Sequence, residues 1–183
     1  MSKALIVIDY TNDFIADDGA LTCGEPGQAI EPYIAQLIHT FVAEQHYVVY
    51  ATDIHHADDV HHPEMKLFPP HNLEGSEGRH LYGSLQEQFE SIRELPFVNW
   101  IDKTRYSAFA GTDLELRLQE RGIRELHLVG VCTDICVLHT AVDAYNKGFS
   151  LVIHERGVAS FNEVGHKWAL GHFKSSLGAD VRS

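Results

Sequence analysis

The sequence is short of positive charge and of cysteine, and both shortages restrict what the protein can do. Its 183 residues contain 14 Lys and Arg against 26 Asp and Glu, a formal net charge of -12. This balance argues against nucleic acid or an anionic membrane as the main partner, because both attract basic surfaces. The 3 cysteines are an odd number and too few for a disulfide framework, which favours a reducing compartment.

Long hydrophobic runs are also missing. The apolar run near the N-terminus, residues 4–8, is too short for the hydrophobic part of a secretory signal and ends at Asp9. No other segment approaches the length that spans a bilayer. We therefore expect a cytoplasmic protein that does not bind membranes.

The composition that remains is that of one globular domain. Hydrophobic residues make up 44% and charged residues 22% of the chain, which are ordinary values for a folded protein. No internal repeat or low-complexity segment marks a boundary, and the length suits one core. We expect residues 1–183 to form a single domain.

Short apolar runs rich in β-branched residues alternate along the chain with segments of helical periodicity. The expected strands are 4–8, 47–52, 97–101, 125–129 and 149–154. The expected helices are about 30–42, 112–121, 137–145 and 164–177. This alternation predicts an α/β fold with a mostly parallel sheet and helices on both of its faces.

Two details of the pattern bear on local structure. Thr112 and Glu115 have the spacing of a capping box at the start of a helix, and Gly122 would end that helix. About forty residues after Asp53 are rich in His, Gly, Pro and Glu and show little periodicity. A loop of that length in a compact domain usually has a function.

Residues with charged or reactive side chains follow the predicted strands. They are Asp9, Asp53, Lys103 and Cys136. The carboxyl ends of parallel strands meet at one edge of a sheet, and ligands bind there. An acid, a lysine and a cysteine gathered at that edge supply a proton acceptor, an electrostatic partner and a nucleophile.

Cys136 is expected in the first turn of the helix that follows strand 125–129. Free backbone N–H groups and the helix dipole at that position favour a thiolate and can hold an oxyanion. The alternative is that Cys136 is a small buried hydrophobe, as most free cysteines are.

A second group of polar residues begins with Asp53 and His55. Residues two apart in an extended segment point to the same side, so this pair can share one metal ion, with further ligands from the loop. The candidates in the loop are His56, His61, His62, Glu64 and His71. A solvated polar loop with adventitious metal affinity is the alternative. The histidines on predicted helices and strands are expected to have no functional partner; they are His39, His46, His127, His139, His154, His166 and His172.

Four motifs, in order along nearly the whole chain, resemble the isochorismatase-like cysteine hydrolases, and within them the nicotinamidase/pyrazinamidase branch. The motifs are Asp-Tyr-Thr-Asn-Asp-Phe at 9–14, Thr-Asp-Ile-His at 52–55, Lys103 with Tyr-Ser-Ala-Phe at 106–109, and Gly-Val-Cys-Thr-Asp-Ile-Cys at 130–136. Tyr-Thr at 10–11 departs from the family, which often has Gln at the second position. The resemblance implies a three-layer α/β/α fold with a roughly six-stranded sheet.

The resemblance also implies a role for each matching residue. The implied catalytic triad is Asp9, Lys103 and Cys136, and the implied oxyanion hole is formed by the backbone N–H groups of Cys132 and Cys136, after a cis peptide between Val131 and Cys132. The implied metal ligands are Asp53, His55 and His71, with Glu64 as the fourth and His62 as the alternative fourth. The residues that would contact an aromatic ring are Phe14, Phe68 and Tyr106.

The resemblance implies hydrolysis of nicotinamide, and of pyrazinamide, to the carboxylic acid and ammonia through a thioester. One divalent ion is implied, with zinc suited to the mixed donor set and iron or manganese left open. The partner would be a small carboxamide, and a homo-oligomer stays open. Three alternatives remain: a metal-free amide or ureido hydrolase of the superfamily, an isochorismatase, and a non-catalytic binding module on the same fold.

Overall fold

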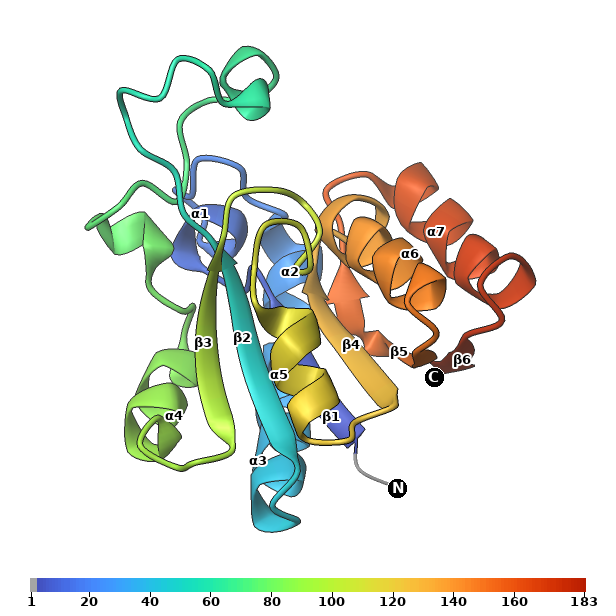
Figure 1. The fold of residues 1–183 in the computed structure, drawn as a ribbon. Helices are drawn as coiled ribbons and strands as arrows, with labels where there is room; N and C mark the ends of the chain where they lie inside the picture. The colour runs from blue at the N-terminus through green and yellow to red at the C-terminus, as the bar shows by residue number, and fades with distance from the viewer. Residues whose placement is uncertain (1–2) are drawn as a thin grey trace.

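In the computed structural model, which describes residues 3–183, six parallel strands form one sheet between two layers of helices (Figure 1). The strands lie in the order β3-β2-β1-β4-β5-β6. Their bounds are β1 Lys3–Ile8, β2 Tyr47–Asp53, β3 Val98–Lys103, β4 Glu125–Val131, β5 Ser150–Ala159 and β6 Asp180–Arg182. The expected α/β/α fold with a parallel sheet is confirmed.

The two helical layers follow from the alternation of side chains along the central strand β1. Ile6 and Ile8 point into a core shared with the last three helices, and Leu5 and Val7 into a core shared with the earlier ones. The first layer contains α5 Leu114–Glu120, α6 Leu138–Asn146 and α7 Glu163–Ser175. On the other face lie α1 Asn12–Ile15, α2 Gly24–Ala29, α3 Glu31–Ala43 and α4 Ser84–Ile92.

Several elements differ from the sequence prediction, which also had no helix at α1 or α2. The sequence pattern located neither β6, which has only 3 residues, nor α4, whose apolar face is narrow in a polar segment. The predicted capping box is wrong: α5 begins at Leu114, Thr112 Oγ1 accepts from Leu114 N at 3.3 Å, and the Glu115 carboxylate contacts Lys147 Nζ at 2.5 Å instead. Gly122 ends this segment with a φ of 62°, as expected.

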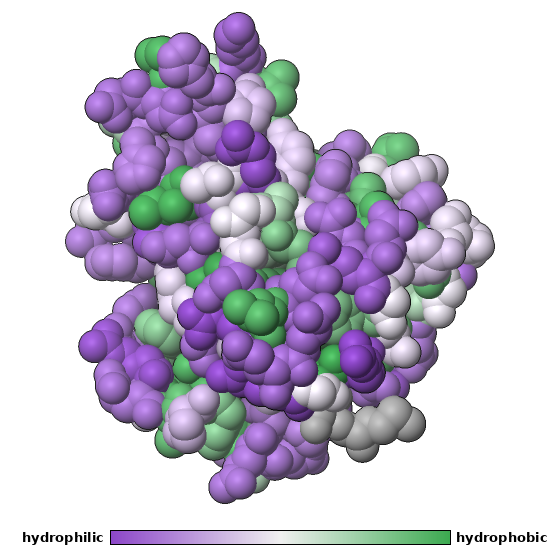
Figure 2. Space-filling view, viewed as in Figure 1, coloured by the Kyte–Doolittle hydropathy of each residue, from purple (hydrophilic) through white to green (hydrophobic). Residues whose placement is uncertain are grey.

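The long segment between β2 and β3 is folded, although its sequence shows little periodicity. It carries short 3-10 helices at Pro63–Lys66 and Glu77–Arg79 before α4. Its first part projects beyond the carboxyl ends of the strands, at the top of Figure 1, and its surface is largely hydrophilic (Figure 2). Within residues 3–183, no helix is long and apolar enough to cross a membrane.

The register of the sheet brings the strand ends together. Asp53 at the end of β2 is paired with Lys103 at the end of β3, and Ile8 is paired with Gly130 of β4. Gly130 has a φ of 115°, and a Cβ there would lie 2.0 Å from the carbonyl oxygen of Ile8. Only glycine allows this approach, so the nucleophile segment after β4 lies beside Asp9.

Candidate active site and metal site

A buried lysine between two carboxylates forms the centre of the site. Lys103 Nζ lies 2.7 Å from Asp9 Oδ2 and 2.5 Å from Asp53 Oδ1, and it donates to the carbonyl oxygen of Arg105 at 3.2 Å. Asp9, Asp53 and Lys103 are all 0% exposed. Because an isolated buried charge is costly, this cation stabilises both carboxylates and is stabilised by them.

The backbone fixes the direction of Asp9. Its φ is 52°, in the left-handed region that Asp tolerates better than most residues. Asp9 Oδ1 accepts a hydrogen bond from Asp53 N at 2.8 Å. The other oxygen is thereby directed to Lys103.

Cys136 lies beside this ion cluster. One oxygen each of Asp9 and Asp53 and the Cys136 sulfur lie within 4.8 Å of one another. Cys136 belongs to a π-helical turn, Thr133–Val137, which comes before α6. The sequence prediction placed it in the first turn of the helix; the structure inserts this extra turn, of a kind that is frequent at functional sites.

The peptide before this turn, Val131–Cys132, is cis, as the resemblance implied. Among the described residues, the N–H of Cys132 meets no hydrogen-bond acceptor. It therefore remains free to donate to a developing oxyanion.

Burial decides the protonation of the cluster. It raises the pKa of the Asp9 carboxyl to about 7, assisted by the charge of Asp53 and opposed by Lys103. Burial also raises the pKa of the Cys136 thiol well above its usual value, although Lys103 opposes it. Burial alone would lower the pKa of Lys103, but Asp53 and Asp9 hold it well above its usual value. The expectation that the helix start favours a thiolate is therefore wrong for the free protein, because desolvation outweighs it.

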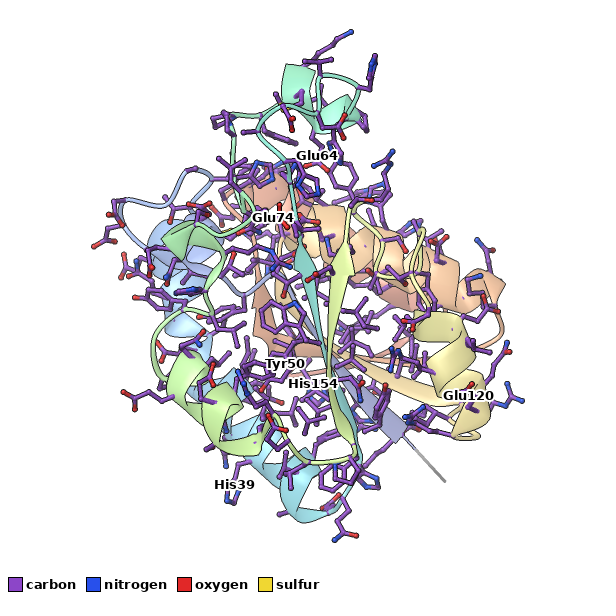
Figure 3. All side chains as sticks on the ribbon, turned by 60° about the vertical axis from the view of Figure 1, so that its left-hand side comes forward. His39, Tyr50, Glu64, Glu74, Glu120 and His154 are labelled. Atoms are coloured by element: carbon purple, nitrogen blue, oxygen red, sulfur yellow. The ribbon has the colours of Figure 1, made fainter. Side chains whose placement is uncertain are left out.

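Four donor residues converge next to this cluster. Oxygen or nitrogen atoms of Asp53, His55, Glu64 and His71 all lie within 4.8 Å of one another, and all four residues are buried. Figure 3 shows Glu64 beyond the carboxyl ends of β2 and β3. The structure thus brings together the four ligands chosen from the resemblance.

The chemistry of these donors fits a divalent metal ion. Asp53 Oδ2, His55 Nε2 and His71 Nε2 are buried without a hydrogen-bond partner. Buried polar atoms are rarely left unpaired, and two imidazoles with two carboxylates are a donor set that zinc and related ions accept.

His62, the alternative fourth ligand, is committed elsewhere. Its Nδ1 accepts from Glu64 N at 3.3 Å, so its Nε2 carries the proton and donates to the carbonyl oxygen of Thr104 at 2.7 Å. Neither ring nitrogen is free for a metal in this arrangement. The histidine instead attaches the turn that carries Glu64 to the residue after Lys103.

A supporting network that the sequence did not reveal holds both metal-site histidines. The carbonyl oxygen of Asn72 accepts from His55 N at 3.0 Å, and Asn72 N donates to Asp13 Oδ2 at 2.7 Å. The side chain of Asn72 bonds to Thr11 Oγ1 at 2.9 Å. The φ of 44° at Asn72 turns the chain directly after His71. Asp13 and Thr11 lie in the motif 9–14, so the segment that carries Asp9 also positions the metal site.

Both clusters face one small pocket. The ring-contact residues expected from the resemblance, Phe14, Phe68 and Tyr106, line it together with Cys136, Glu64 and His71. Asp53 and Cys132 also line it, as do three residues that sequence reasoning missed, Leu21, Ile135 and Phe161. Because these three are ordinary apolar residues in loops or a turn, their types give no signal of a site.

Histidines on the helices and strands, and Cys23, have side-chain contacts that the spacing of the sequence did not suggest. His127 Nδ1 and His154 Nε2 lie 2.8 Å apart, and His166 Nδ1 lies 2.8 Å from Thr133 Oγ1. Cys23 Sγ lies 3.4 Å from Cys132 Sγ, beside the nucleophile turn. Contacts between residues far apart in sequence produce both arrangements.

Fold and site together define an α/β protein with a buried Asp–Lys–Cys cluster beside a four-donor metal-type cluster. The family model of the isochorismatase domain matches residues 3–183, and the chain belongs to this family.

Several relatives cover most or all of the chain. A crystal structure of nicotinamidase/pyrazinamidase PncA from Bacillus subtilis is 63% identical, with a TM-score of 0.99 over 100% of both chains. The nicotinamidase/pyrazinamidase of Mycobacterium tuberculosis is 32% identical over 159 residues, 81% of each chain. The pyrazinamidase of Pyrococcus horikoshii, solved in complex with zinc, is 28% identical, with a TM-score of 0.85 over 99% of this chain and 98% of that one.

Proposed function

We propose that the protein is a nicotinamidase, a cysteine-dependent amidohydrolase that converts nicotinamide, and pyrazinamide by the same chemistry, to the carboxylic acid and ammonia. The observation that carries this proposal is that Cys136 of the Asp–Lys–Cys cluster lines the same aromatic-lined pocket as three of the four metal-type donors, Asp53, Glu64 and His71. The names of the relatives from Bacillus subtilis and Mycobacterium tuberculosis support it.

The first step of the proposed reaction is nucleophilic attack. Asp9, whose pKa of about 7 suits a general base, accepts the thiol proton as Cys136 Sγ attacks the carboxamide carbon. Because the pKa of the free thiol is high, proton transfer accompanies the attack. Lys103 stays charged and offsets the negative charge that moves from Asp9 to the substrate.

The carbonyl oxygen of the substrate becomes an oxyanion, which the N–H groups of Cys132 and Cys136 hold. Protonated Asp9 then returns the proton to the amide nitrogen as the C–N bond breaks, so that ammonia leaves and a thioester remains. Asp9 next takes a proton from a water molecule, whose oxygen attacks the thioester. The C–S bond breaks, Asp9 returns this proton to the Cys136 sulfur, and the carboxylic acid leaves.

Binding and orientation are assigned to the pocket walls. Phe14, Phe68 and Tyr106 offer aromatic surface to a pyridine or pyrazine ring. Asp53, His55, Glu64 and His71 would hold one divalent ion, zinc by preference, with iron and manganese as the alternatives. When bound, that ion supplies a Lewis-acidic position for the ring nitrogen, which orients the carboxamide toward Cys136.

The pocket must open before substrate binds. Its cavity is about 20 Å³, room for roughly one water molecule and far less than a pyridine carboxamide needs. Phe161 lines it and is 48% exposed. This side chain has the most freedom to move aside, because solvent rather than core surrounds half of it.

The test is ammonia release from nicotinamide, pyrazinamide and benzamide, before and after removal of metal with a chelator. Nicotinamide and pyrazinamide should be hydrolysed and should lose most of their rate on chelation, with recovery on addition of zinc. Benzamide has the same carboxamide without a ring nitrogen and should be poor in both states. Equal rates on benzamide and nicotinamide would contradict the proposed ring-nitrogen contact.

The alternatives predict other outcomes in the same assay. A metal-free amide or ureido hydrolase would be insensitive to chelation, and a binding module would release no ammonia. The four converging donor residues, three of them with an unpartnered buried atom, disfavour the first alternative, and the intact Asp–Lys–Cys cluster disfavours the second. An isochorismatase would prefer a vinyl ether. We further propose one domain over residues 1–183, a cytoplasmic location, and a small-molecule carboxamide as the partner, without nucleic acid or membrane. Sedimentation would decide whether copies of the chain associate.

A further inference from the structure

Two thiols that the proposed mechanism does not use lie in contact. Cys23 Sγ and Cys132 Sγ are 3.4 Å apart, and both residues are buried, with 4% and 2% exposed. They are 109 residues apart in sequence, so the fold alone brings them together. Neither is the proposed nucleophile, which is Cys136.

The pair separates two cavities. Cys23 lines a groove of about 630 Å³ formed mainly by the segments Thr22–Pro26 and Val158–Phe161. Cys132 lines the catalytic pocket on the other side. A small oxidant can therefore reach Cys23 through the groove without passing through the catalytic pocket.

Both thiols are attached to parts of the proposed active site. Cys23 N donates to the carbonyl oxygen of Phe14 at 2.7 Å, and Phe14 is a wall of the catalytic pocket. Cys132 provides a backbone N–H of the proposed oxyanion hole. A covalent link between the two side chains would join the α1–α2 segment to the turn that carries the nucleophile.

We propose that Cys23 and Cys132 form a redox-modification site, in which a hydroperoxide converts the two thiols to a disulfide that impairs the catalytic pocket. In the first step the Cys23 sulfur attacks a peroxide oxygen, the O–O bond breaks, and Cys23 sulfenic acid and water form. In the second step Cys132 Sγ attacks that sulfur, the S–O bond breaks, and the hydroxyl leaves with the Cys132 proton as water. Each disulfide consumes one hydrogen peroxide and yields two waters.

The displacement required is small but lies at a sensitive position. A disulfide has an S–S distance of about 2.05 Å, so the sulfurs must approach by about 1.3 Å from their present 3.4 Å. A shift of about 1 Å in catalytic positioning can lower a rate about a hundredfold. The expected loss in kcat therefore lies between roughly tenfold and a hundredfold. This activity loss depends on the proposed function, whereas the cross-link itself does not.

The experiment uses the full-length reduced protein, treated with stoichiometric hydrogen peroxide. Free thiols are then alkylated under denaturing conditions, and the peptides are mapped by mass spectrometry. The expected product is a peptide pair joined through Cys23 and Cys132, lighter by two hydrogens, with Cys136 still alkylated. Ammonia release should fall with the yield of this link and return after treatment with dithiothreitol.

The matched control is Cys23→Ala, which should retain its activity through the same treatment because it cannot form the link. If Cys23 and Cys132 both stay alkylatable while Cys136 is oxidised, or if Cys132 is joined to Cys136 instead, the proposal is overturned. Equal losses of activity in Cys23→Ala and the unaltered protein also overturn it. If the reduced protein releases no ammonia at all, the proposed function fails, and peptide mapping still decides whether the thiol pair reacts.

Discussion

A buried chain of hydrogen bonds in the sheet should make the protein sensitive to mild acid. His127 on β4 and His154 on β5 are both buried, and His127 Nδ1 lies 2.8 Å from His154 Nε2. His127 Nε2 lies 2.9 Å from Glu125 Oε1, and His154 Nδ1 lies 2.8 Å from the Tyr33 hydroxyl. Figure 3 shows His154 within the sheet, far from Glu64 of the metal site.

Only one arrangement of protons satisfies this chain with both imidazoles neutral. His127 Nε2–H donates to the Glu125 carboxylate, which makes its Nδ1 an acceptor. His154 Nε2–H donates to that Nδ1, and its own Nδ1 accepts from the hydroxyl of Tyr33. A proton added at His127 Nδ1 would place two N–H donors opposite each other, so the hydrogen-bond pattern disfavours charge on His127. A proton on His154 Nδ1 could still be donated to the Tyr33 oxygen, so the charge on His154 is opposed by burial and by the nearby His127.

The size of the effect follows from the pKa of His154. Burial, and then the nearby His127, lowers this pKa from 6.5 to about 4. As the pH falls, the unfolded chain takes up a proton on His154 near pH 6.5, whereas the folded chain takes it up only near pH 4. The contribution of neutral His154 to the unfolding free energy is therefore complete above pH 6.5 and is lost between pH 6.5 and pH 4. At 1.36 kcal/mol per pH unit the full contribution is about 3 kcal/mol, of which roughly 2 kcal/mol is lost between pH 7 and pH 5.

The variant His154→Gln tests this reasoning, because its amide can donate to His127 and accept from Tyr33 without titrating. Urea unfolding is measured at pH 7, 6 and 5. Between pH 7 and pH 5 the variant should lose roughly 2 kcal/mol less unfolding free energy than the unaltered protein. The matched control is His39→Gln on the exposed side of α3, which should keep the pH dependence of the unaltered protein. Parallel losses in the unaltered protein and His154→Gln would refute the argument.

Three other predictions concern the site. Lys103→Met should lower the unfolding free energy by about 3–5 kcal/mol and abolish most ammonia release, because two buried carboxylates lose their cation; Lys147→Met, at a partly exposed pair, should cost at most about 1 kcal/mol in the same urea titration. Glu64→Gln should weaken zinc binding, measured by chelator competition, more than the roughly 10–100-fold expected for His62→Gln, which only supports the site; the reverse order would make His62 the fourth ligand. Cys136→Ala should abolish ammonia release and leave the urea midpoint nearly unchanged, and residual turnover would remove the thioester from the mechanism.

The strand ends were predictable because the sheet leaves them little freedom. Asp9, Asp53 and Lys103 directly follow or end apolar runs, and a parallel sheet places such residues at one edge whatever the loops do. The choice between Glu64 and His62 as fourth ligand was not predictable. It depends on hydrogen bonds that occupy both ring nitrogens of His62, one to the carbonyl oxygen of Thr104 and one from the backbone N–H of Glu64. The observed helix boundaries differ from the predicted ones for a similar reason, because tertiary contacts rather than the local sequence pattern decide where the last turn of a helix lies.

Electrostatics were the least predictable property of the site. The position of Cys136 near a helix start suggested a thiolate, and that effect amounts to about 1 kcal/mol. Complete burial beside Asp9 acts in the opposite direction and is larger, as the raised pKa of the thiol shows. Burial depends on how the segment 55–80 folds back over the strand ends, and nothing in the pattern of that segment predicts it.

The double role of Asp53 explains why the two clusters occur together. One of its oxygens lies against Lys103, while the other is buried without a hydrogen-bond partner among the metal-type donors. In-register pairing of Asp53 with Lys103 fixes the first contact, and the alternation of side chains that brings His55 to the same side fixes the second. The nucleophile cluster and the metal-type cluster therefore share Asp53 at the end of β2, and the sheet fixes where the two clusters meet. A site in which a ring must be oriented against a nucleophile within a fraction of an ångström requires this kind of rigid spacing.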